Sequence, residues 1–393
     1  MHCVCRGWWL PTVLMAVAVA PRAAAQPPRS PVIASLAPWQ DQRLQDAAHP
    51  GHLFRSRDAS LDTGAVRYVV KYCACVDPAH GDEVVPIEGY IGMPAPSAAN
   101  WYHSGFLFVI INGQDIGRAR LSSMVVAESG TRGILDMVWH HSLADVRVRF
   151  LALPQDDKLL VEVALDPKVE VQSLVLRTTC YPSYFTSWNH RDGARRVQTP
   201  SSLVRQGETT TLPAADNWWG VYYDEVFDVA KGEGDGPCGM LVLPEEAQEL
   251  TVQATDYPVN TTISYRPQLR RLHLAFWDWT GHPNAEVLAA MPAAAERARA
   301  ALQETDFTPA TLREFDFAGA RREVEQALAS EAVRSQLGER LGQMQDWLAA
   351  CEPLFAQPAV EQSIAGEERF LSAVGEYQQF SWEVKLAELL STL

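Results

Sequence analysis

The chain has 393 residues, and its content of 47% hydrophobic and 21% charged residues is that of a folded globular protein. Its formal net charge of -15 at pH 7 argues against nucleic acid and against anionic membrane surfaces as partners, because both carry negative charge. The length is sufficient for one large domain and a smaller one.

The N-terminal segment has the pattern of a secretory signal. Arg6 precedes an apolar run, and Ala23 and Ala25 stand at the small-residue positions before a cleavage site. The run is too short for a stable membrane span with stop-transfer flanks. Residues 1–25 therefore predict export, so that the mature protein is secreted or periplasmic and has no stable membrane span. The alternative is that the segment is retained as an N-terminal anchor.

The middle of the chain predicts β-structure. Residues 26–60 are rich in proline, alanine and polar residues, which predicts a linker and an irregular lead-in. Residues 61–283 contain short runs of strand-forming residues that recur between turn signals. In one run, apolar residues alternate with Arg147 and Arg149, as in a strand with one face in a core. About a dozen such strands with short connections predict a large antiparallel two-sheet β-sandwich.

From 284 to 393 the composition shifts to Ala, Glu, Arg, Gln and Leu, which predicts an α-helical C-terminal region. We expect helix after a break at Pro292, then over a long stretch interrupted near Gly338 or Gly342, and finally from about 360 to 390. The fold class is therefore mainly β, with a helical region packed on the sandwich. Oligomerisation or docking of a partner is the alternative role for the helical region.

Between Cys180 and Gly239, aromatic residues alternate with Asn, His, Asp and Arg. A sugar ring presents apolar C–H faces and a polar rim, so a sugar site combines flat aromatic side chains with charged and amide groups. We therefore expect a carbohydrate or polysaccharide as the partner. Filling of the core is the competing interpretation of these aromatic residues. The expected ligand-binding residues are Trp188, Asn189, Arg191, Asp192, Arg195, Trp218, Trp219, Tyr222, Trp277 and His282.

Catalysis at a sugar site would require an acid and a base. The candidates are His190, Asp224, Glu225 and Asp278. Paired carboxylates on different strands could flank a glycosidic bond, and a His with a carboxylate could transfer protons at a sugar ring. Asp224 and Glu225 are adjacent, so only one of them can line a given site in a strand. Structural roles, in turns or on a solvated strand face, are the competing interpretation.

The cysteines and the motifs that the sequence lacks determine which disulfides, metals and cofactors we expect. Export permits disulfides, and Cys180 with Cys238 is the preferred pair because a bond between them would close the loop around the aromatic stretch. Burial of each cysteine as a free thiol is the alternative. The sequence has no pattern of metal ligands and no Gly-rich phosphate loop followed by a helix. Neither a metal nor a cofactor is therefore expected.

The run 144–166, an alternating strand, an acidic turn and a second strand, is similar to hairpins of the mutarotase-like β-sandwich superfamily. The segment 67–279 resembles that fold in layout. The superfamily recurs in sugar epimerases and in glycan-active enzymes, so the resemblance implies a carbohydrate context. Those epimerases use two histidines and a glutamate, but the sequence around His190 and His282 does not match their motifs. The whole chain also resembles exported proteins of environmental bacteria, which implies no function.

Three functions remain open at this point. The first, which the missing acid–base motif favours, is an exported carbohydrate-binding or surface-interaction protein with no assured turnover. The second is a glycan-active enzyme, a hydrolase, lyase or epimerase, that uses carboxylate and histidine chemistry. The third is a structural envelope protein whose helical region mediates assembly.

Overall fold

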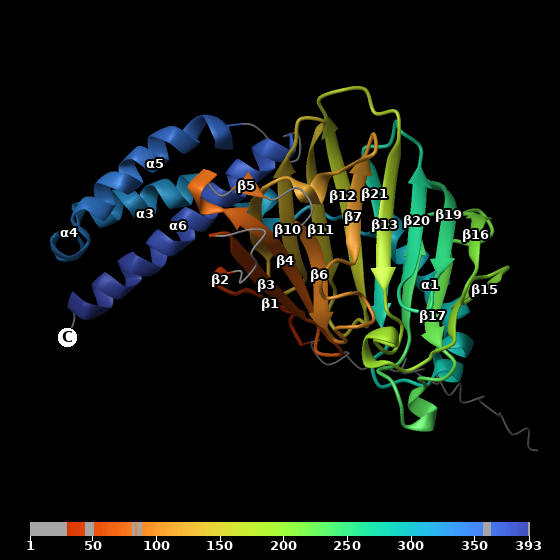
Figure 1. Cartoon of the computed structure of the whole chain (residues 1–393). Coiled ribbons are helices and arrows are strands. Elements are labelled where there is room, and N and C mark those ends of the chain that lie inside the picture. The colour runs from red at the N-terminus through yellow and green to blue at the C-terminus, as the bar shows by residue number, and fades with distance from the viewer. Residues whose placement is uncertain (1–29, 44–50, 81–82, 85–88, 357–362, 392–393) are drawn as a thin grey trace, which may run out of the picture.

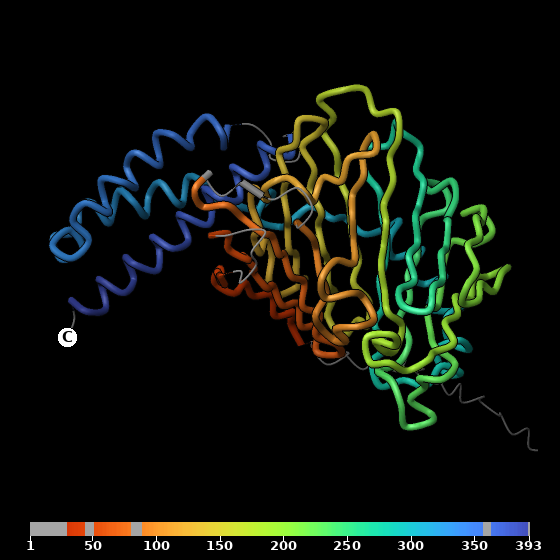
Figure 2. The backbone as a smooth tube through the Cα atoms, viewed as in Figure 1, coloured from red at the N-terminus to blue at the C-terminus, as the bar shows by residue number. Residues whose placement is uncertain are grey.

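The computed structural model of the chain describes residues 30–43, 51–80, 83–84, 89–356 and 363–391. The described strands form two antiparallel sheets that pack face to face, and the described α-helices follow the last strand (Figures 1 and 2). The predicted fold class is confirmed, because the chain is mainly β and ends in a helical region. The predicted signal segment, residues 1–25, lies outside the described residues.

The larger sheet has 12 strands, three of which (β2, Gln40–Arg43; β5, Glu83–Val84; β8, Gln114–Asp115) pair at the sides of β3, β4 and β7. The remaining strands follow one another in the order β1 (Ile33–Leu36), β3 (Leu53–Asp62), β4 (Arg67–Asp77), β6 (Tyr90–Ala95), β7 (Leu107–Ile111), β13 (Leu174–Cys180), β20 (Val259–Tyr265), β19 (Ala247–Ala254) and β16 (Thr209–Pro213).

The second sheet has nine strands, and hairpins join four consecutive strands at one of its edges. The strand order is β15 (Leu203–Arg205), β14 (Arg195–Gln198), β17 (Trp219–Asp224), β18 (Cys238–Val242), β21 (Arg271–Asp278), β12 (Lys158–Pro167), β11 (Ala144–Ala152), β10 (Gly133–His140) and β9 (Leu121–Glu128).

The main core lies between the two sheets. Successive side chains of a strand point to opposite faces, so the inner face of β13 contributes Leu174 and Leu176, which are buried. Trp101, from a loop, packs edge-on against Phe276 of β21, with ring centroids 4.9 Å apart. Its indole N–H donates to the carbonyl oxygen of Trp277 over 2.8 Å, which satisfies the one polar group that this ring buries. Burial of each such large side chain stabilises the fold by about 1.5–3 kcal/mol.

The lead-in is more regular than its composition predicts. β1, β2 and most of β3 lie within 26–60, the range predicted as a linker and irregular segment, and they pair with the 12-stranded sheet. All four residues of β2 are exposed. A strand at a sheet edge buries little, so polar residues are tolerated there and the alternation that marks a central strand is missing.

The C-terminal region contains six helices in the part of the chain that the structure describes. The predicted interruption near Gly338 is confirmed, since this residue has a φ of 43° between α4 and α5. The predicted final helix is also confirmed. The helices are α1 (Asn284–Glu304), α2 (Ala310–Glu314), α3 (Phe317–Ala329), α4 (Glu331–Leu337), α5 (Glu339–Phe355) and α6 (Ile364–Ser391).

The expected break at Pro292 is wrong, because α1 continues through this proline. A proline inside a helix removes one hydrogen bond and costs about 3 kcal/mol. Apolar residues recur three or four positions apart on one side of α1 and are buried, which offsets that cost. They are Val287, Met291, Ala295, Ala298 and Leu302. None of the described helices is long and apolar enough to cross a membrane.

The helices contact only one of the two sheets closely. α1 packs against β17, β18 and β21, and α6 packs against β10, β11 and β12, all of them strands of the nine-stranded sheet. In Figure 1 the outer face of the 12-stranded sheet is toward the viewer and α1 lies behind the sandwich. The described helices therefore leave the outer face of the 12-stranded sheet open.

Candidate functional site

The open outer face of the 12-stranded sheet is rich in hydroxyl and amide groups at its centre. Because strand residues alternate, Arg177 and Thr179 of β13 point outward, beside Asn260 and Thr262 of β20. The Thr179 hydroxyl donates to the Asn260 side-chain oxygen over 2.8 Å. Such a face offers several hydrogen-bonding groups to a polar ligand.

A pocket lined by aromatic side chains, called here the aromatic pocket, adjoins this face at the C-terminal end of β13. It has a volume of about 280 Å³ and is formed by loops that leave β6, β13 and β19. Its lining residues are Tyr102, His103, Phe185, Trp188 and Tyr257.

Packed aromatic rings lie beneath the aromatic pocket, and its rim is exposed. The ring of Tyr181, which is buried, packs against Tyr102 and Tyr257 with centroids 4.6 and 4.5 Å apart. Trp188 belongs to a short helical turn, η3 (Ser187–Asn189), and its side chain is 76% exposed. A large apolar side chain in water, held beside a packed aromatic cluster, is the kind of surface that marks a binding site.

His103 is the titratable group of the aromatic pocket. Burial and the nearby Lys71 lower its pKa, so the ring is neutral at pH 7. Its Nδ1 atom is buried and has no hydrogen-bond partner among the described residues. The loop that carries His103 crosses β6 at Gly92, where any side chain would overlap the His103 carbonyl oxygen. The backbone thus fixes an imidazole that has an unused polar atom.

Two of the residues predicted to face a ligand instead support the loop that carries Trp188. Arg195 is buried and donates to the carbonyl oxygens of Pro182 and Tyr184. Asp224 is also buried, and its carboxylate lies 3.4 Å from the Arg195 guanidinium. This carboxylate accepts hydrogen bonds from the backbone N–H groups of Ala194, Val226 and Phe227. Both side chains are fully buried among these contacts, so neither residue is available to a ligand.

Asp278 has a similar supporting role. Its carboxylate accepts the backbone N–H of Ser97 over 3.0 Å, the amide of Asn100 over 2.7 Å and the hydroxyl of Thr280 over 2.7 Å. Burial raises the pKa of Asp278 to about 6 despite these bonds. The Asn100 side-chain oxygen accepts the backbone N–H of Ser183. Asp278 thereby ties the loop of Tyr102 to the loop of Trp188.

The remaining aromatic residues predicted to bind a ligand lie in the core, which corrects that expectation. Their side chains are at most 9% exposed, because they fill the space between the sheets or beneath α1. They are Trp218, Trp219, Tyr222 and Trp277.

The predicted polar residues around η3 are exposed. Asn189, His190, Arg191 and Asp192 follow Trp188 on the surface, and the Arg191 guanidinium lies over the ring of Phe227, 4.6 Å from its centroid. Elsewhere on the surface, Glu225 pairs with Arg196 over 2.7 Å and His282 pairs with Glu286 over 3.2 Å.

The candidate acid–base residues differ in environment, because Asp224 and Asp278 are buried whereas His190 and Glu225 are exposed. Among the described residues no hydrogen bond or ion pair joins His190, Glu225 and Asp278 to one another. Asp224 and Asp278 have structural partners, as the previous contacts show. No group of three or more His, Cys, Asp or Glu side chains in the described ranges is placed to hold a metal ion.

The expected disulfide is not formed. Cys180 of β13 and Cys238 of β18 belong to opposite sheets, and both are buried free thiols. The Cys180 sulfur lies 3.7 Å from the carbonyl oxygen of Val259, and the Cys238 sulfur lies 3.8 Å from that of Asn100. Burial and the neighbouring Cys180 thiol raise the pKa of Cys238 well above its usual value. The pair is packed in the core, which fits the free-thiol alternative.

Sequence reasoning missed four residues of the aromatic pocket, Tyr102, His103, Phe185 and Tyr257. Tyr102 and His103 stand together in a Trp-Tyr-His run after a predicted strand, which is a usable signal. Tyr257 stands alone in a turn and gives no signal. His141 lines a separate pocket.

No protein-family model matches the sequence, and no curated protein matches it. Solved structures with similar folds include a Klebsiella pneumoniae protein provisionally assigned as an aldose 1-epimerase, with 10% identity, a TM-score of 0.33, and coverage of 70% of this chain and 97% of that one. A TPR-domain protein from Parabacteroides distasonis has 11% identity and a TM-score of 0.38 over 92% of this chain and 89% of its own.

An α-galactosidase from Geobacillus stearothermophilus has 10% identity and a TM-score of 0.34 over 56% of this chain and 39% of its own. A heparan sulfate lyase from Pedobacter heparinus has 9% identity and a TM-score of 0.32 over 57% of this chain and 35% of its own. Proteins named for action on carbohydrates are thus among the similar structures. At these identities and TM-scores, no function passes from them to this chain.

Proposed function

We propose that this chain is an exported protein that binds an oligosaccharide or polysaccharide on the outer face of the 12-stranded sheet. One observation carries the proposal: Trp188 is 76% exposed at the rim of a pocket that Tyr102, His103, Phe185 and Tyr257 also line. Export is the part that rests on the sequence pattern of residues 1–25 alone.

The chemistry of the aromatic pocket suits a sugar ring. The apolar C–H face of a pyranose can stack on Trp188, and the ring hydroxyls can bond to His103 or to the tyrosine hydroxyls. Beyond the pocket, the outward side chains of Thr179, Asn260 and Thr262 offer further partners to a chain of sugars. A purely apolar ligand would leave these polar groups without partners, at a cost in free energy.

Binding without turnover is the function that the site supports best. Glycoside hydrolysis needs two carboxylates on either side of the scissile bond. The buried partners of Asp224 and Asp278 leave neither of them free for this role. A glycan-active enzyme and an envelope protein that assembles through its helical region remain the alternatives to a binding protein.

The test is a glycan-array screen of the wild-type protein, with two variants applied to every hit. Trp188→Ala removes the stacking surface, and we expect about a tenfold or greater loss of affinity. Trp382→Ala is the matched control, because Trp382 lies on α6 and is 73% exposed. Its affinity should equal that of the wild type.

The screen separates the alternatives as well. Mass spectrometry of a bound glycan after long incubation should show it unchanged, and cleavage or epimerisation would favour the enzyme. Absence of binding to every glycan, or equal loss in the two variants, would show that the aromatic pocket is not a sugar site.

A further inference from the structure

A second pocket opens on the same face of the 12-stranded sheet as the aromatic pocket. It has a volume of about 450 Å³ and lies where β8 and a short helical turn, η2 (Ile116–Arg118), fold back after β7. Ile110 and Arg177, which line it, are outward residues of β7 and β13. The pocket is called here the charged pocket.

β13 connects the two pockets. Arg177 lies in the charged pocket, Thr179 follows it on the same face, and Tyr181 packs beneath the aromatic pocket. Four residues of extended chain span about 13 Å, at about 3.3 Å for each residue. A single short oligosaccharide could therefore occupy both pockets.

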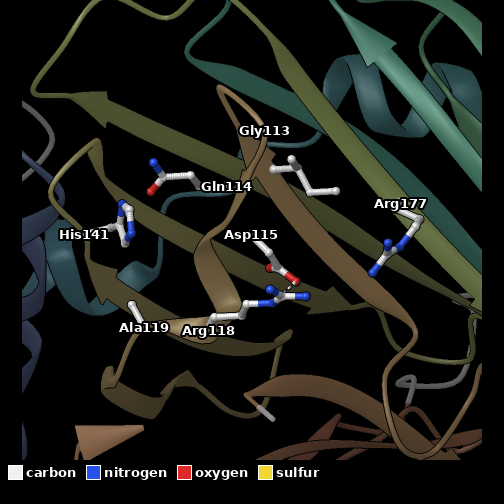
Figure 3. Close-up of a pocket in the computed structure, with 8 residues that line it drawn as sticks. Gly113, Gln114, Asp115, Arg118, Ala119, His141 and Arg177 are labelled. Carbon is white, nitrogen blue, oxygen red and sulfur yellow. Dashed lines mark ion pairs between the residues drawn. The ribbon is translucent and has the colours of Figure 1, made fainter. Parts of the chain in front are cut away.

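The charged pocket contains more positive than negative groups. Figure 3 shows Asp115 and Arg118 at its centre, with Arg177 on one side and His141 on the other. Two guanidinium groups and one carboxylate give a local net charge of +1 when the histidine is neutral (2 − 1 = +1). This sign is opposite to that of the whole chain, which carries a net charge of -15.

Both arginines of the charged pocket have N–H groups that are available to a ligand. Arg118 lies 3.9 Å from the Asp115 carboxylate, which is too long for a hydrogen bond, and its side chain is half exposed. The guanidinium carbon of Arg177 lies over the ring of Phe108, 4.3 Å from the centroid, a contact that positions the side chain without using its N–H groups. In the described part of the chain, neither guanidinium donates a hydrogen bond to a protein oxygen.

His141 and Asp115 add one donor and one acceptor. The Nδ1 atom of His141 accepts the backbone N–H of Leu143 over 3.2 Å, so the proton of the neutral ring is on Nε2. Burial and the nearby Lys168 lower the pKa of His141, which keeps the ring neutral at pH 7. Asp115 accepts the backbone N–H of Gly117 with one oxygen, which leaves the other free to accept a hydroxyl.

We propose that the charged pocket binds the carboxylate or sulfate group of an acidic sugar unit, and that another unit of the same oligosaccharide stacks in the aromatic pocket. Guanidinium groups match planar and tetrahedral oxyanions with two donors each, whereas a carboxylate such as Asp115 suits the hydroxyls of the same sugar. This inference rests on the proposed function and names its ligand class, an anionic glycan rather than a neutral one.

The experiment compares matched anionic and neutral glycans by titration calorimetry. The probes are oligogalacturonate with its methyl ester, and dextran sulfate with dextran. We expect the wild-type protein to bind the anionic member of at least one pair about tenfold more tightly, and less so at high salt. The pair that shows the preference identifies carboxylate or sulfate as the group. Sodium sulfate and sodium phosphate alone should bind far more weakly, because they do not reach the aromatic pocket.

Variants assign the preference to the charged pocket. The double variant Arg118→Gln, Arg177→Gln should lose the preference and bind both members of a pair equally. The control removes the same charge from the helical side, with Arg297→Gln on α1 and Arg334→Gln on α4, both of which are exposed. This control should keep the preference.

The outcomes distinguish the two proposals. Equal binding of neutral and anionic glycans by the wild type, with dependence on Trp188, would overturn the charged-pocket inference and leave the proposed function standing. A preference that survives in the double variant, or simple sulfate and phosphate binding as tightly as the oligosaccharide, would also overturn it. Absence of binding to any glycan would overturn both.

Discussion

On the outer face of the nine-stranded sheet, Arg149 and Asp136 are paired and buried, whereas on the outer face of the 12-stranded sheet Arg177 borders an open pocket. The difference comes from α6. Its Glu367 is buried against Arg147 and Arg149, so one face of the sandwich is closed by a helix. The other face has no described helix over it and keeps its polar groups available.

A row of outward charged residues in a strand can face either solvent or a covering helix. Alternating apolar and charged residues in β11 predict a strand with one solvated face. In the structure, Arg147 and Arg149 of this strand are at most 2% exposed, and their partner Glu367 is 220 and 218 residues away. Charge alternation alone therefore does not distinguish a face that binds ligand from a face that binds a helix.

The largest expected effect is a loss of stability caused by a substitution on the outer face of the nine-stranded sheet, which α6 covers. Arg149→Met leaves the carboxylate of Asp136 buried without its partner, which should lower the free energy of unfolding by about 3–5 kcal/mol. Urea denaturation measures the change. Arg177→Met on the open face is the matched variant and should change stability by about 0.5 kcal/mol or less. Equal destabilisation by the two substitutions would remove the distinction between the faces.

A change of intermediate size is expected in the pH dependence of folding stability, through His273 on the outer face of the nine-stranded sheet. Burial opposes the charge of His273, but the carboxylates of Glu162, 3.6 Å from Nε2, and of Glu246, 2.6 Å from Nδ1, outweigh it and raise the pKa of His273 to about 9. The stabilisation is complete below the unfolded value of about 6.5 and is lost as pH rises through 9, with each unit worth about 1.4 kcal/mol.

His273→Gln isolates this contribution from other titrating groups. The variant should be less stable than the wild type at pH 6, and the difference should narrow by about 2–3 kcal/mol by pH 10. Urea denaturation at several pH values gives the two curves. A difference that does not depend on pH would mean that folding leaves the pKa of His273 at its unfolded value.

The smallest expected effect is on the open face, and it concerns ligand binding only. His103→Phe keeps an aromatic ring in the aromatic pocket and removes its hydrogen-bonding atoms. We expect affinity for a glycan ligand to fall by about 0.5–1.5 kcal/mol, with stability almost unchanged. His282→Phe, at an exposed site beside Glu286, is the control and should bind normally. Unchanged affinity for both variants would exclude His103 from the site.

Several features of the fold follow from the sequence, and the exceptions have physical causes. Alternation predicts the central strands because each has one face in the core. β1 and β2 are missed because an edge strand takes its structure from the strand beside it. The continuation of α1 through Pro292 is missed because a buried apolar stripe, rather than local propensity, holds that helix together.

The candidate site is predictable only in part. The loop of Trp188 is identified from its composition, and the structure places this residue at the rim of the aromatic pocket. The mixture of aromatic and charged residues does not reveal that Arg195 and Asp224 would be buried beneath that loop. Tyr102 and Tyr257 reach the pocket from loops far apart in the chain, and no local pattern records such a meeting.

The central claim is that a glycan lies on the open face and not on the helical side. Hydroxyl-radical footprinting with mass spectrometry tests it directly, since Trp188 and Trp382 are almost equally exposed, at 76% and 73%. With a saturating glycan ligand, oxidation of Trp188 should slow several-fold while oxidation of Trp382 stays the same. Protection of Trp382, with Trp188 oxidised as fast as in the free protein, would contradict the claim.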